Sequence, residues 1–315
     1  MQRRSEFFGT CPPGLGRLLR DRLAETPGVT VTAAGSDGES DVVLFDADRD
    51  GRVLATGIRQ ADGVFAVAAR ARRSAAADPA VLAARCWQRD GAQRALSLWA
   101  EQVRPLSPAM TFRVAARMQT GPRALRAGLR AALAEVIRRD RPRWRPSAAG
   151  ELEICLCEWH DGELVTGLRL GGNAAGAAAA VPPAVAAAMV ALAGPPGSVL
   201  LDPCRGSGTV LAEARAAGWR AEGTGADAAA RAGHEIPEAD AALGACVTRL
   251  PPGTTAAGTA AALAEMSRVT RSGGAVVLLA AEVPRTAWPT ALRLRRQVPV
   301  RLPAGRETIW VYRRA

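Results

Sequence analysis

Ser198-Val-Leu-Leu-Asp-Pro-Cys-Arg-Gly-Ser-Gly-Thr209 is the stretch of this 315-residue chain that decides its fold class. The apolar run Val199 to Leu201 predicts a buried parallel strand, which ends at Asp202. Ligands of open α/β sheets collect outside the carboxyl edge, where this aspartate is expected to lie. Gly206 and Gly208 let the backbone approach a ligand that a Cβ would hold off. The stretch therefore predicts a strand, a glycine turn and a helix of an α/β fold.

A dinucleotide-binding start of the Rossmann type is the rival interpretation of these residues. It requires G-x-G-x-x-G, whereas Thr209, Val210 and Leu211 follow the second glycine here. The sequence excludes that fingerprint. A glycine turn that binds no ligand stays open as the structural alternative.

The loop resembles the cofactor loop of the amino-methylating class I methyltransferases, whose usual pattern is D-P-F-C-G-S-G-T. The aspartate, the glycines and the threonine match, while Cys204 stands for the usual aromatic residue and Arg205 for the usual small one. The resemblance implies S-adenosylmethionine as the cofactor. The residues that would bind it are Asp202, Pro203, Gly206, Ser207, Gly208 and Thr209.

The length of 315 residues leaves room for about two domains and a sizeable core. We expect neither a membrane span nor a secretory signal, because no long uniformly apolar stretch occurs, and we therefore expect a cytoplasmic protein. The six cysteines form no disulfide framework. Cys155 and Cys157 lie near His160, but no second thiol pair exists, so no metal is expected.

The charge of the chain is unevenly distributed along it. The formal net charge is +11, and all 41 basic residues are arginine. Residues 1–150 hold 25 arginines and 15 acidic residues, against 16 and 15 in residues 151–315. A one-sided basic excess is typical of proteins that bind a phosphate backbone. The alternative is a solvated basic surface.

The first half of the chain predicts an α+β module. Alternation predicts a strand at 111–117, and 123–141 predicts an amphipathic helix with Leu125, Leu129, Leu133 and Ile137 on its apolar face. Strands at 152–157 and 164–170 flank a hairpin turn at 160–162. The other expected elements are helical segments at 15–23 and 78–104, strands at 29–32, 41–45 and 61–67, and a turn at 48–51 that leads into a short strand at 53–54.

This half resembles the THUMP domain and its ferredoxin-like partner in tRNA and rRNA guanine-N2 methyltransferases. The matching stretches are 58–65, 111–114, 123–126, 142–145, 152–154 and 167–170. The resemblance implies that the module captures structured RNA by shape and phosphate contacts. The candidate RNA-binding residues are Arg113, Arg117, Arg123, Arg126, Arg130, Arg143 and Arg145.

The domain plan follows from these resemblances. We expect an N-terminal ferredoxin-like region at 1–75 and a THUMP-type RNA-binding domain at 76–170. A low-complexity linker at 171–180 precedes a shortened class I methyltransferase domain at 181–315. The predicted fold class is thus α/β, a Rossmann-like methyltransferase domain preceded by an α+β module.

The second strand of such a domain ends in an acid that contacts the cofactor ribose. Here the stretch 221–227 resembles the family pattern G-x-D-x-D at Gly223 and Asp227, while Gly225 replaces the first acid. Asp227 takes over this contact, or the contact is lost. Only eighteen residues separate Asp227 from Cys246, fewer than the roughly 25 that a helix, a strand and their loops need.

A truncated third strand is therefore expected. Asp240 is either a remnant of the family's adenine contact or a solvated loop acid.

The stretch 245–253 corresponds to the family's catalytic V-T-N-L-P-F-G. Arg249 stands for the asparagine that accepts from the target amino group, and Pro252 stands for the aromatic residue. Arginine has no acceptor atom. The catalytic candidates are the degenerate motif residues Arg249, Leu250, Pro251 and Gly253. After this motif, a helix closed by glycine is expected at 263–274, with strands at 275–279 and 308–313.

Two functions remain open from the sequence. The first is an RNA methyltransferase that depends on S-adenosylmethionine and modifies guanine N2 in tRNA or rRNA. The second is a non-catalytic RNA-binding protein with a degenerate methyltransferase domain. The cofactor loop favours the first, and Arg249 and Gly225 favour the second.

Overall fold

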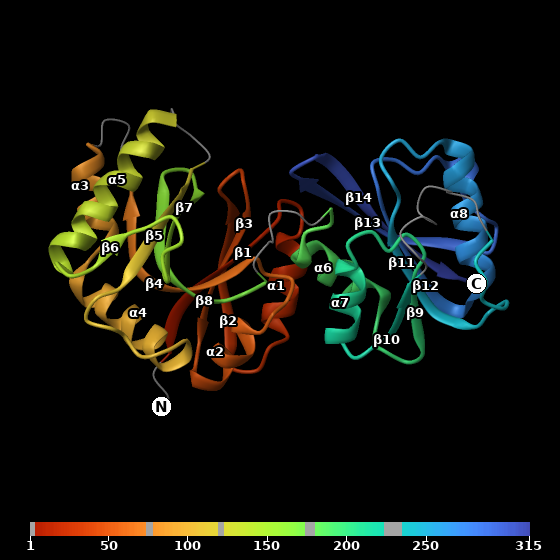
Figure 1. Ribbon diagram of the computed structural model, residues 1–315, viewed down its shortest axis with the longest axis horizontal. Coiled ribbons are helices and arrows are strands. Elements are labelled where there is room, and N and C mark those ends of the chain that lie inside the picture. The colour runs from red at the N-terminus through yellow and green to blue at the C-terminus, as the bar shows by residue number, and fades with distance from the viewer. Residues whose placement is uncertain (1–3, 74–77, 119–122, 174–179, 224–234) are drawn as a thin grey trace. The chain divides into compact units, whose positions relative to one another are not determined.

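A computed structural model describes residues 4–73, 78–118, 123–173, 180–223 and 235–315 of the chain (Figure 1). The chain divides into two compact units, Met1–Asn173 and Ala174–Ala315. Each unit contains one β-sheet with helices packed on it. None of the helices in the described ranges is long and apolar enough to cross a membrane.

Unit 1 is built on an eight-stranded sheet of order β2-β3-β1-β4-β8-β7-β5-β6. The β7–β8 hairpin confirms the predicted turn, and Gly162 takes a φ of +69° there. The same sheet runs through residues 1–75 and 76–170, so the division between these two regions stays a prediction. The strands are β1 (Ser5–Cys11), β2 (Val29–Ser36), β3 (Asp41–Ala47), β4 (Gly63–Arg72), β5 (Thr111–Arg117), β6 (Arg145–Pro146), β7 (Leu152–His160) and β8 (Glu163–Gly171).

The described residues of unit 1 form five helices: α1 (Gly16–Ala24), α2 (Arg49–Thr56), α3 (Pro79–Cys86), α4 (Arg89–Gln102) and α5 (Arg123–Asp140). The apolar face predicted for α5 is confirmed, because Leu129, Leu133 and Ile137 are all fully buried. The single helical segment predicted at 78–104 is two helices. The break falls at Trp87 and Gln88, whose extended backbone angles separate α3 from α4.

The strand predicted at 53–54 is wrong, because these residues belong to α2. Asp48 caps this helix through Oδ1, which accepts from the backbone N–H of Gly51 at 2.8 Å. The cap converts the expected turn into the first turn of a helix. Val53 and Leu54 are 57% and 50% exposed, so the apolar pair that suggested a buried strand lies at the surface.

Unit 2 is built on a six-stranded sheet of order β10-β9-β11-β12-β14-β13. The first four strands in this order are parallel to one another. Strand β14 runs antiparallel to both of its neighbours, β12 and β13. Among the described strands of unit 2, β10 and β13 lie at the two edges of the sheet. The strands are β9 (Val199–Asp202), β10 (Arg220–Gly223), β11 (Leu243–Arg249), β12 (Thr270–Ala280), β13 (Leu292–Leu302) and β14 (Gly305–Arg314).

The described helices of unit 2 are α6 (Pro183–Ala193), α7 (Thr209–Ala216) and α8 (Ala256–Val269), with a short 3₁₀ helix, η2, at Arg285–Ala287. The glycine-closed helix predicted at 263–274 is wrong at its carboxyl end. Helix α8 ends at Val269, and β12 begins with the buried, β-branched Thr270. Gly273 and Gly274 instead lie in β12, where the pairing with β11 shifts register. A Cβ on Gly274 would lie 2.8 Å from the carbonyl oxygen of Gly244 on β11.

Gly91 and Gly128 provide a test of helix packing in unit 1. Gly91 on α4 faces β4 so closely that an added Cβ would overlap the carbonyl oxygen of Ala68. We expect Gly91→Ala to lower the free energy of unfolding by about 1–3 kcal/mol. Gly128→Ala on α5 is the control, since the nearest atom to its Cβ would be Pro79 Cγ at 3.6 Å.

The Gly128→Ala control should leave stability unchanged or raise it by up to about 1 kcal/mol, because alanine favours the helix. Urea unfolding followed by circular dichroism measures both variants. Equal midpoints for Gly91→Ala and Gly128→Ala would contradict the close approach of α4 to β4.

Candidate functional site

The carboxyl edge of the unit 2 sheet brings Asp202 and Thr248 together. Asp202 ends β9, Thr248 lies one residue before the end of the neighbouring β11, and both side chains are buried. The Thr248 hydroxyl donates to Asp202 Oδ1 at 2.7 Å. The backbone N–H of Cys204 donates to Asp202 Oδ1 at 3.2 Å and to Thr248 Oγ1 at 3.1 Å. This network fixes the start of the predicted cofactor loop against β11.

Burial controls the ionisation of Asp202, which is only 1% exposed. Desolvation raises the pKa of its carboxyl to about 6, and the hydrogen bonds from Thr248 and the Cys204 N–H oppose this shift. The carboxylate is therefore ionised at neutral pH at a cost in folding free energy. Thr248 was not among the site residues predicted from the sequence. Its role depends on the pairing of β9 with β11.

The loop that follows Asp202 holds two glycines in the left-handed region. Gly206 has a φ of +49° and Gly208 a φ of +77°, and Gly208 is also the N-cap of α7. The atom nearest to a Cβ on Gly206 would be 3.7 Å away, and on Gly208 it would be 3.9 Å away. An added Cβ would therefore make only ordinary van der Waals contacts at either position. A side chain at either position would still strain the backbone, because both φ values are positive.

The rest of the loop is polar and partly exposed. The hydroxyls of Ser207 and Thr209 lie 2.9 Å apart at the start of α7, where a helix presents backbone N–H groups. Pro203 is half-buried beside Asp202. A polar loop at a helix N-terminus presents backbone N–H groups that can bind acceptor groups of a ligand.

The predicted ribose and adenine contacts have different outcomes. Gly223 ends β10 next to Asp202, and a Cβ there would lie 2.6 Å from Leu211 Cδ1. Asp227 and Gly225 lie outside the described residues. Asp240 is 75% exposed and precedes β11, so it lies at the amino edge of the sheet, opposite the loop. Its carboxylate accepts from Arg268 at 2.7 Å, and the structure does not bring it together with Asp202. This placement agrees with the solvated loop acid rather than the adenine contact.

Arg249 ends β11 and is held by Glu307 of β14. Arg249 Nε donates to Glu307 Oε2 at 3.0 Å, and Nη2 bonds to the other carboxylate oxygen. Its Nη1 donates to the carbonyl oxygen of Ala180 at 2.9 Å. The two charged side chains are 12% and 13% exposed. The guanidinium that replaces the family's amide is thus neutralised inside the unit. Glu307 lies 58 residues away in sequence, so no local pattern indicated this pair.

The other residues of the degenerate motif form a turn beside a pocket. Thr254 donates from its backbone N–H and its hydroxyl to the carbonyl oxygen of Pro251, at 3.2 and 2.7 Å. Gly253 has a φ of +82° and no atom within 4 Å of a Cβ position. The adjoining pocket measures about 350 Å³ and is lined by this turn, by the end of β12 and by the β13–β14 turn. Leu250, Pro251 and Gly253 all line it.

The order of the strands places the end of β11 between two features. Strand β9, which leads into the loop, is the neighbour of β11 on one side. Strand β12, whose last residue lines the pocket, is its neighbour on the other side. Arg249 lines this pocket, one residue after Thr248, which bonds to the loop. The arrangement leaves the cofactor loop and the pocket on adjacent sides of one strand end.

Most of the arginines predicted to bind RNA have partners within unit 1. Arg113 donates to Glu153 at 2.7 Å, and Arg117 donates to the Ser40 hydroxyl at 2.7 Å. Arg126 bonds to Glu39 and to the carbonyl of Met118, and Arg145 bonds to the carbonyls of Pro142 and Trp144. Arg130 and Arg143 are exposed. The side chain of Arg123 lies outside the described residues.

Cys155 and Cys157 lie side by side on β7, with their sulfur atoms 3.3 Å apart and both residues buried. His160 lies at the exposed end of the same strand. Across the described ranges, no group of three or more His, Cys, Asp or Glu residues is arranged to hold a metal ion.

Comparisons with known proteins give structural similarity only. No protein-family model matches the chain, and no curated protein is significantly similar to it. Among solved structures, TrmN from Thermus thermophilus matches with a TM-score of 0.64 and 20% sequence identity, over 99% of this chain and 100% of that one. SMU.472, assigned as a methyltransferase and complexed with SAH, matches with a TM-score of 0.61 and 10% identity, over 100% and 99%.

A predicted N6-adenine-specific DNA methylase from Listeria monocytogenes str. 4b F2365 matches with a TM-score of 0.59 and 14% identity, over 99% of this chain and 97% of that one. The three similarities extend over both units. The chain therefore has the α/β fold of these methylases along its whole length.

The buried carboxyl of Asp202 predicts a pH dependence of stability. Because its pKa is about 6 in the folded protein and near 3.8 in the unfolded chain, the folded state binds the extra proton between these values. The stability that Asp202 contributes should therefore fall as the pH rises from about 4 to 7, by up to about 3 kcal/mol. Asp202→Asn should lack this loss.

Urea unfolding of wild type and Asp202→Asn between pH 4 and 8 measures the effect. The difference in free energy of unfolding should move in favour of the variant as the pH rises, whatever its value at pH 4. A constant difference across this range would mean that the pKa of Asp202 is not raised.

Proposed function

We propose that this protein is a methyltransferase that depends on S-adenosylmethionine and acts on an amino group of structured RNA. The observation that carries the proposal is the loop from Asp202 to Thr209, with its two open left-handed glycines at the carboxyl edge of β9. The similarity to SMU.472, which was solved with SAH, supports the same ligand class for this loop. When bound, S-adenosylmethionine supplies an electrophilic methyl group on a sulfonium.

In this proposal, residues of the chain position the two reactants. The backbone at Gly206 and Gly208 would bind the cofactor at the start of α7, and the buried Asp202 would hold the loop in place through Thr248 and the Cys204 N–H. The acceptor would enter the pocket at the end of β11. Placing an amine beside an electrophilic methyl group accelerates transfer by proximity, without a strong general base.

The RNA part of the proposal rests on charge and on resemblance. Residues 1–150, which lie in unit 1, hold 25 arginines and 15 acidic residues, and the sequence resembles the ferredoxin-like and THUMP regions of guanine-N2 methyltransferases. We accordingly propose unit 1 as the module that captures RNA, and guanine N2 in tRNA or rRNA as the target. The predicted partition at 75/76 and the linker at 171–180 belong to the same proposal.

A non-catalytic RNA-binding protein is the second candidate function, and one observation favours it. The place of the amide acceptor is taken by Arg249, each of whose three guanidinium nitrogens donates a hydrogen bond to Glu307 or to the carbonyl of Ala180. The end of β11 therefore offers the pocket an ion pair in place of an acceptor oxygen. A domain of this kind would keep its fold without transferring methyl groups.

Cofactor binding is tested by Gly208→Val with a matched control. Gly208 and Gly273 have φ values of +77° and +73°, and a Cβ at either would meet no atom closer than 3.9 Å. Both valine variants are thus strained alike, but Gly273 lies on β12 near the amino edge of the sheet. Calorimetry should show binding of S-adenosylmethionine by wild type and Gly273→Val, and loss of at least tenfold in affinity in Gly208→Val.

Equal affinity in the two glycine variants would remove the loop from the cofactor site. Absence of binding by the wild type would refute the methyltransferase proposal itself and leave the non-catalytic candidate.

Catalysis is tested at Arg249 and Glu307. Replacing Arg249 alone would leave the carboxylate of Glu307 buried and unpaired, so the acceptor has to be restored by Arg249→Asn together with Glu307→Gln. Because asparagine can accept from an amino group and arginine cannot, this double variant should transfer methyl groups faster than wild type by tenfold or more. Adding Pro252→Phe should raise the rate further by stacking on the base.

The assay is transfer of tritium from labelled S-adenosylmethionine to bulk tRNA and rRNA, with mass spectrometry of nucleosides to place the methyl group. Rapid transfer by wild type that Arg249→Ala leaves unchanged would show that the acceptor does not bind at the end of β11. No transfer by wild type or by either restored variant, with RNA binding intact, would favour the non-catalytic candidate.

A further inference from the structure

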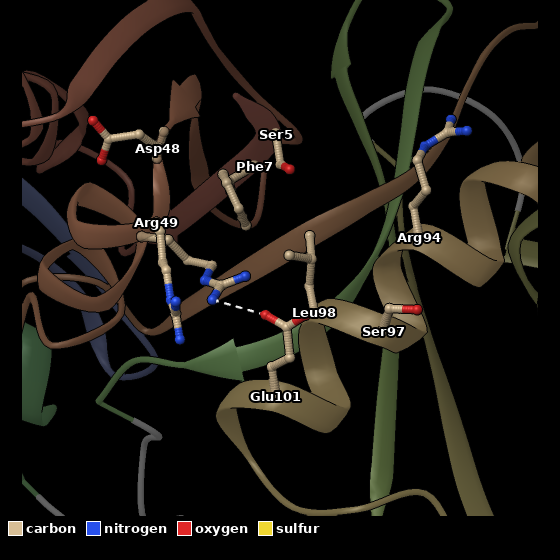
Figure 2. A pocket seen from close by; sticks show the side chains of 10 residues that line it. Ser5, Phe7, Asp48, Arg49, Arg94, Ser97, Leu98 and Glu101 are labelled. Atoms are coloured by element: carbon tan, nitrogen blue, oxygen red, sulfur yellow. Dashed lines mark hydrogen bonds and ion pairs between the residues drawn. The ribbon is translucent and has the colours of Figure 1, made fainter. Parts of the chain in front are cut away.

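A second pocket, of about 520 Å³, lies within unit 1 and is separate from the site at β9 and β11 (Figure 2). Its walls come from β1, from the start of α2 and from α4. Phe7 and Leu98 give it an apolar floor, and three arginines line it: Arg49, Arg52 and Arg94. Two acidic residues, Asp48 and Glu101, also line it, so the balance of charge is positive.

Arg52 carries the argument, because its guanidinium is buried in this pocket with spare donors. The side chain is 8% exposed, and Nη2 donates to Glu101 Oε2 at 3.1 Å. Its Nε is buried and has no hydrogen-bond partner among the described residues. This nitrogen is inaccessible, so a ligand in the pocket would meet the small exposed part of the Arg52 side chain, which lines the pocket.

The surroundings of Arg52 favour an anion over water. Arg49 and Arg94 are exposed, and each adds a guanidinium whose hydrogen-bonding partner is not found in the described part of the chain. In Figure 2, Arg49 extends from α2 on the side of Glu101, while Arg94 extends away from it at the rim. One oxygen of Asp48 is already engaged by the N–H of Gly51, as the cap of α2.

The position of Arg52 is also fixed by close backbone packing. Gly51 lies so near Gly28, the residue before β2, that an added Cβ on Gly51 would be 2.6 Å from the carbonyl carbon of Gly28. The backbone N–H of Asp48 donates to the Gly28 carbonyl at 3.1 Å. The start of α2 is thus anchored, and the Arg52 side chain is held under the pocket in advance of any ligand.

We propose that this pocket binds a phosphate group, and that in the working protein this phosphate belongs to the RNA backbone. Guanidinium groups match the geometry of phosphate oxygens and stay charged at all relevant pH values. A phosphate group offers more acceptor oxygens than a carboxylate to the guanidiniums that line the pocket. The RNA part rests on the proposed function, whereas the phosphate part does not.

The phosphate part is tested on the full chain by ¹⁵N NMR of arginine side chains. The Nε–H resonance of Arg52, identified by its loss in Arg52→Lys, should shift on titration with inorganic phosphate. In Arg49→Gln, the phosphate affinity derived from this titration should be at least threefold lower than in the wild type. Sodium chloride at equal ionic strength should leave the resonance in place. No shift with phosphate up to tens of millimolar would overturn the site.

The RNA part is tested by filter binding of bulk tRNA to the full chain over a range of salt concentrations. Arg49→Gln combined with Arg94→Gln should weaken binding by about fivefold or more, and should lower the slope of log affinity against log salt by about 0.7–0.9. The charge-matched control is Arg17→Gln combined with Arg20→Gln, on the exposed surface of α1. The control should change the RNA affinity and the salt slope less than the pocket variant does.

The outcomes separate this proposal from the proposed function. A phosphate shift with equal RNA affinity in the pocket variant and the α1 control would assign the site to a free phosphate compound and overturn its RNA role. A phosphate shift in a wild-type protein that binds no RNA would refute the RNA function and keep the pocket. Loss of RNA affinity in the pocket variant alone would support both parts.

Discussion

The hydrogen bond from Thr248 to Asp202 is the contact on which the candidate site depends. It joins the ends of two parallel strands, and the N–H of Cys204 binds to both side chains, so the loop begins at a fixed point on the sheet. The bond also makes burial of the Asp202 carboxyl tolerable, because the desolvated carboxylate keeps two donors. Without this network, the backbone of Gly206 and Gly208 would have no defined position relative to β11. The loop and the pocket therefore lie beside the same strand end, because Thr248 bonds to the loop and the next residue, Arg249, lines the pocket.

The ion pair between Arg249 and Glu307 shows how the fold accommodates a residue that the chemistry does not require. An unpaired guanidinium at the end of β11 would place a positive charge beside a site proposed to bind a sulfonium. Glu307 neutralises that charge from β14, and the Ala180 carbonyl binds the remaining donor. The substitution is thus compatible with cofactor binding and incompatible with the amide's role as an acceptor. Charge compensation of this kind bears on the choice between the two proposed functions, since it leaves the proposed cofactor loop intact and offers no acceptor oxygen to the proposed target amine.

Local sequence patterns were sufficient where structure depends on near neighbours. The strand, glycine loop and helix at residues 199–216, the amphipathic α5 and the β7–β8 hairpin all follow from residues within a few positions of one another. Prediction was wrong at residues 53–54, where the Asp48 cap created a helix, and at residues 270–274, where two glycines accommodate a register shift inside β12. Thr248, Glu307 and the role of Asp240 depend on strand order or on partners far along the chain, which a single sequence does not display.

The arginines of unit 1 also show that interactions in the fold decide what a sequence count means. Arg113, Arg117, Arg126 and Arg145 bond to carboxylates, a hydroxyl or backbone carbonyls, so much of the charge counted in the sequence is already engaged by the protein itself. A guanidinium whose N–H groups donate to internal partners attracts phosphate only through its charge at long range. Salt screens this attraction. Strong contacts require donors that remain free. In unit 1, the exposed Arg49 and Arg94 line one pocket with Arg52 and have no hydrogen-bonding partner among the described residues, so the pattern of hydrogen bonds supports the proposed phosphate site more specifically than net charge does.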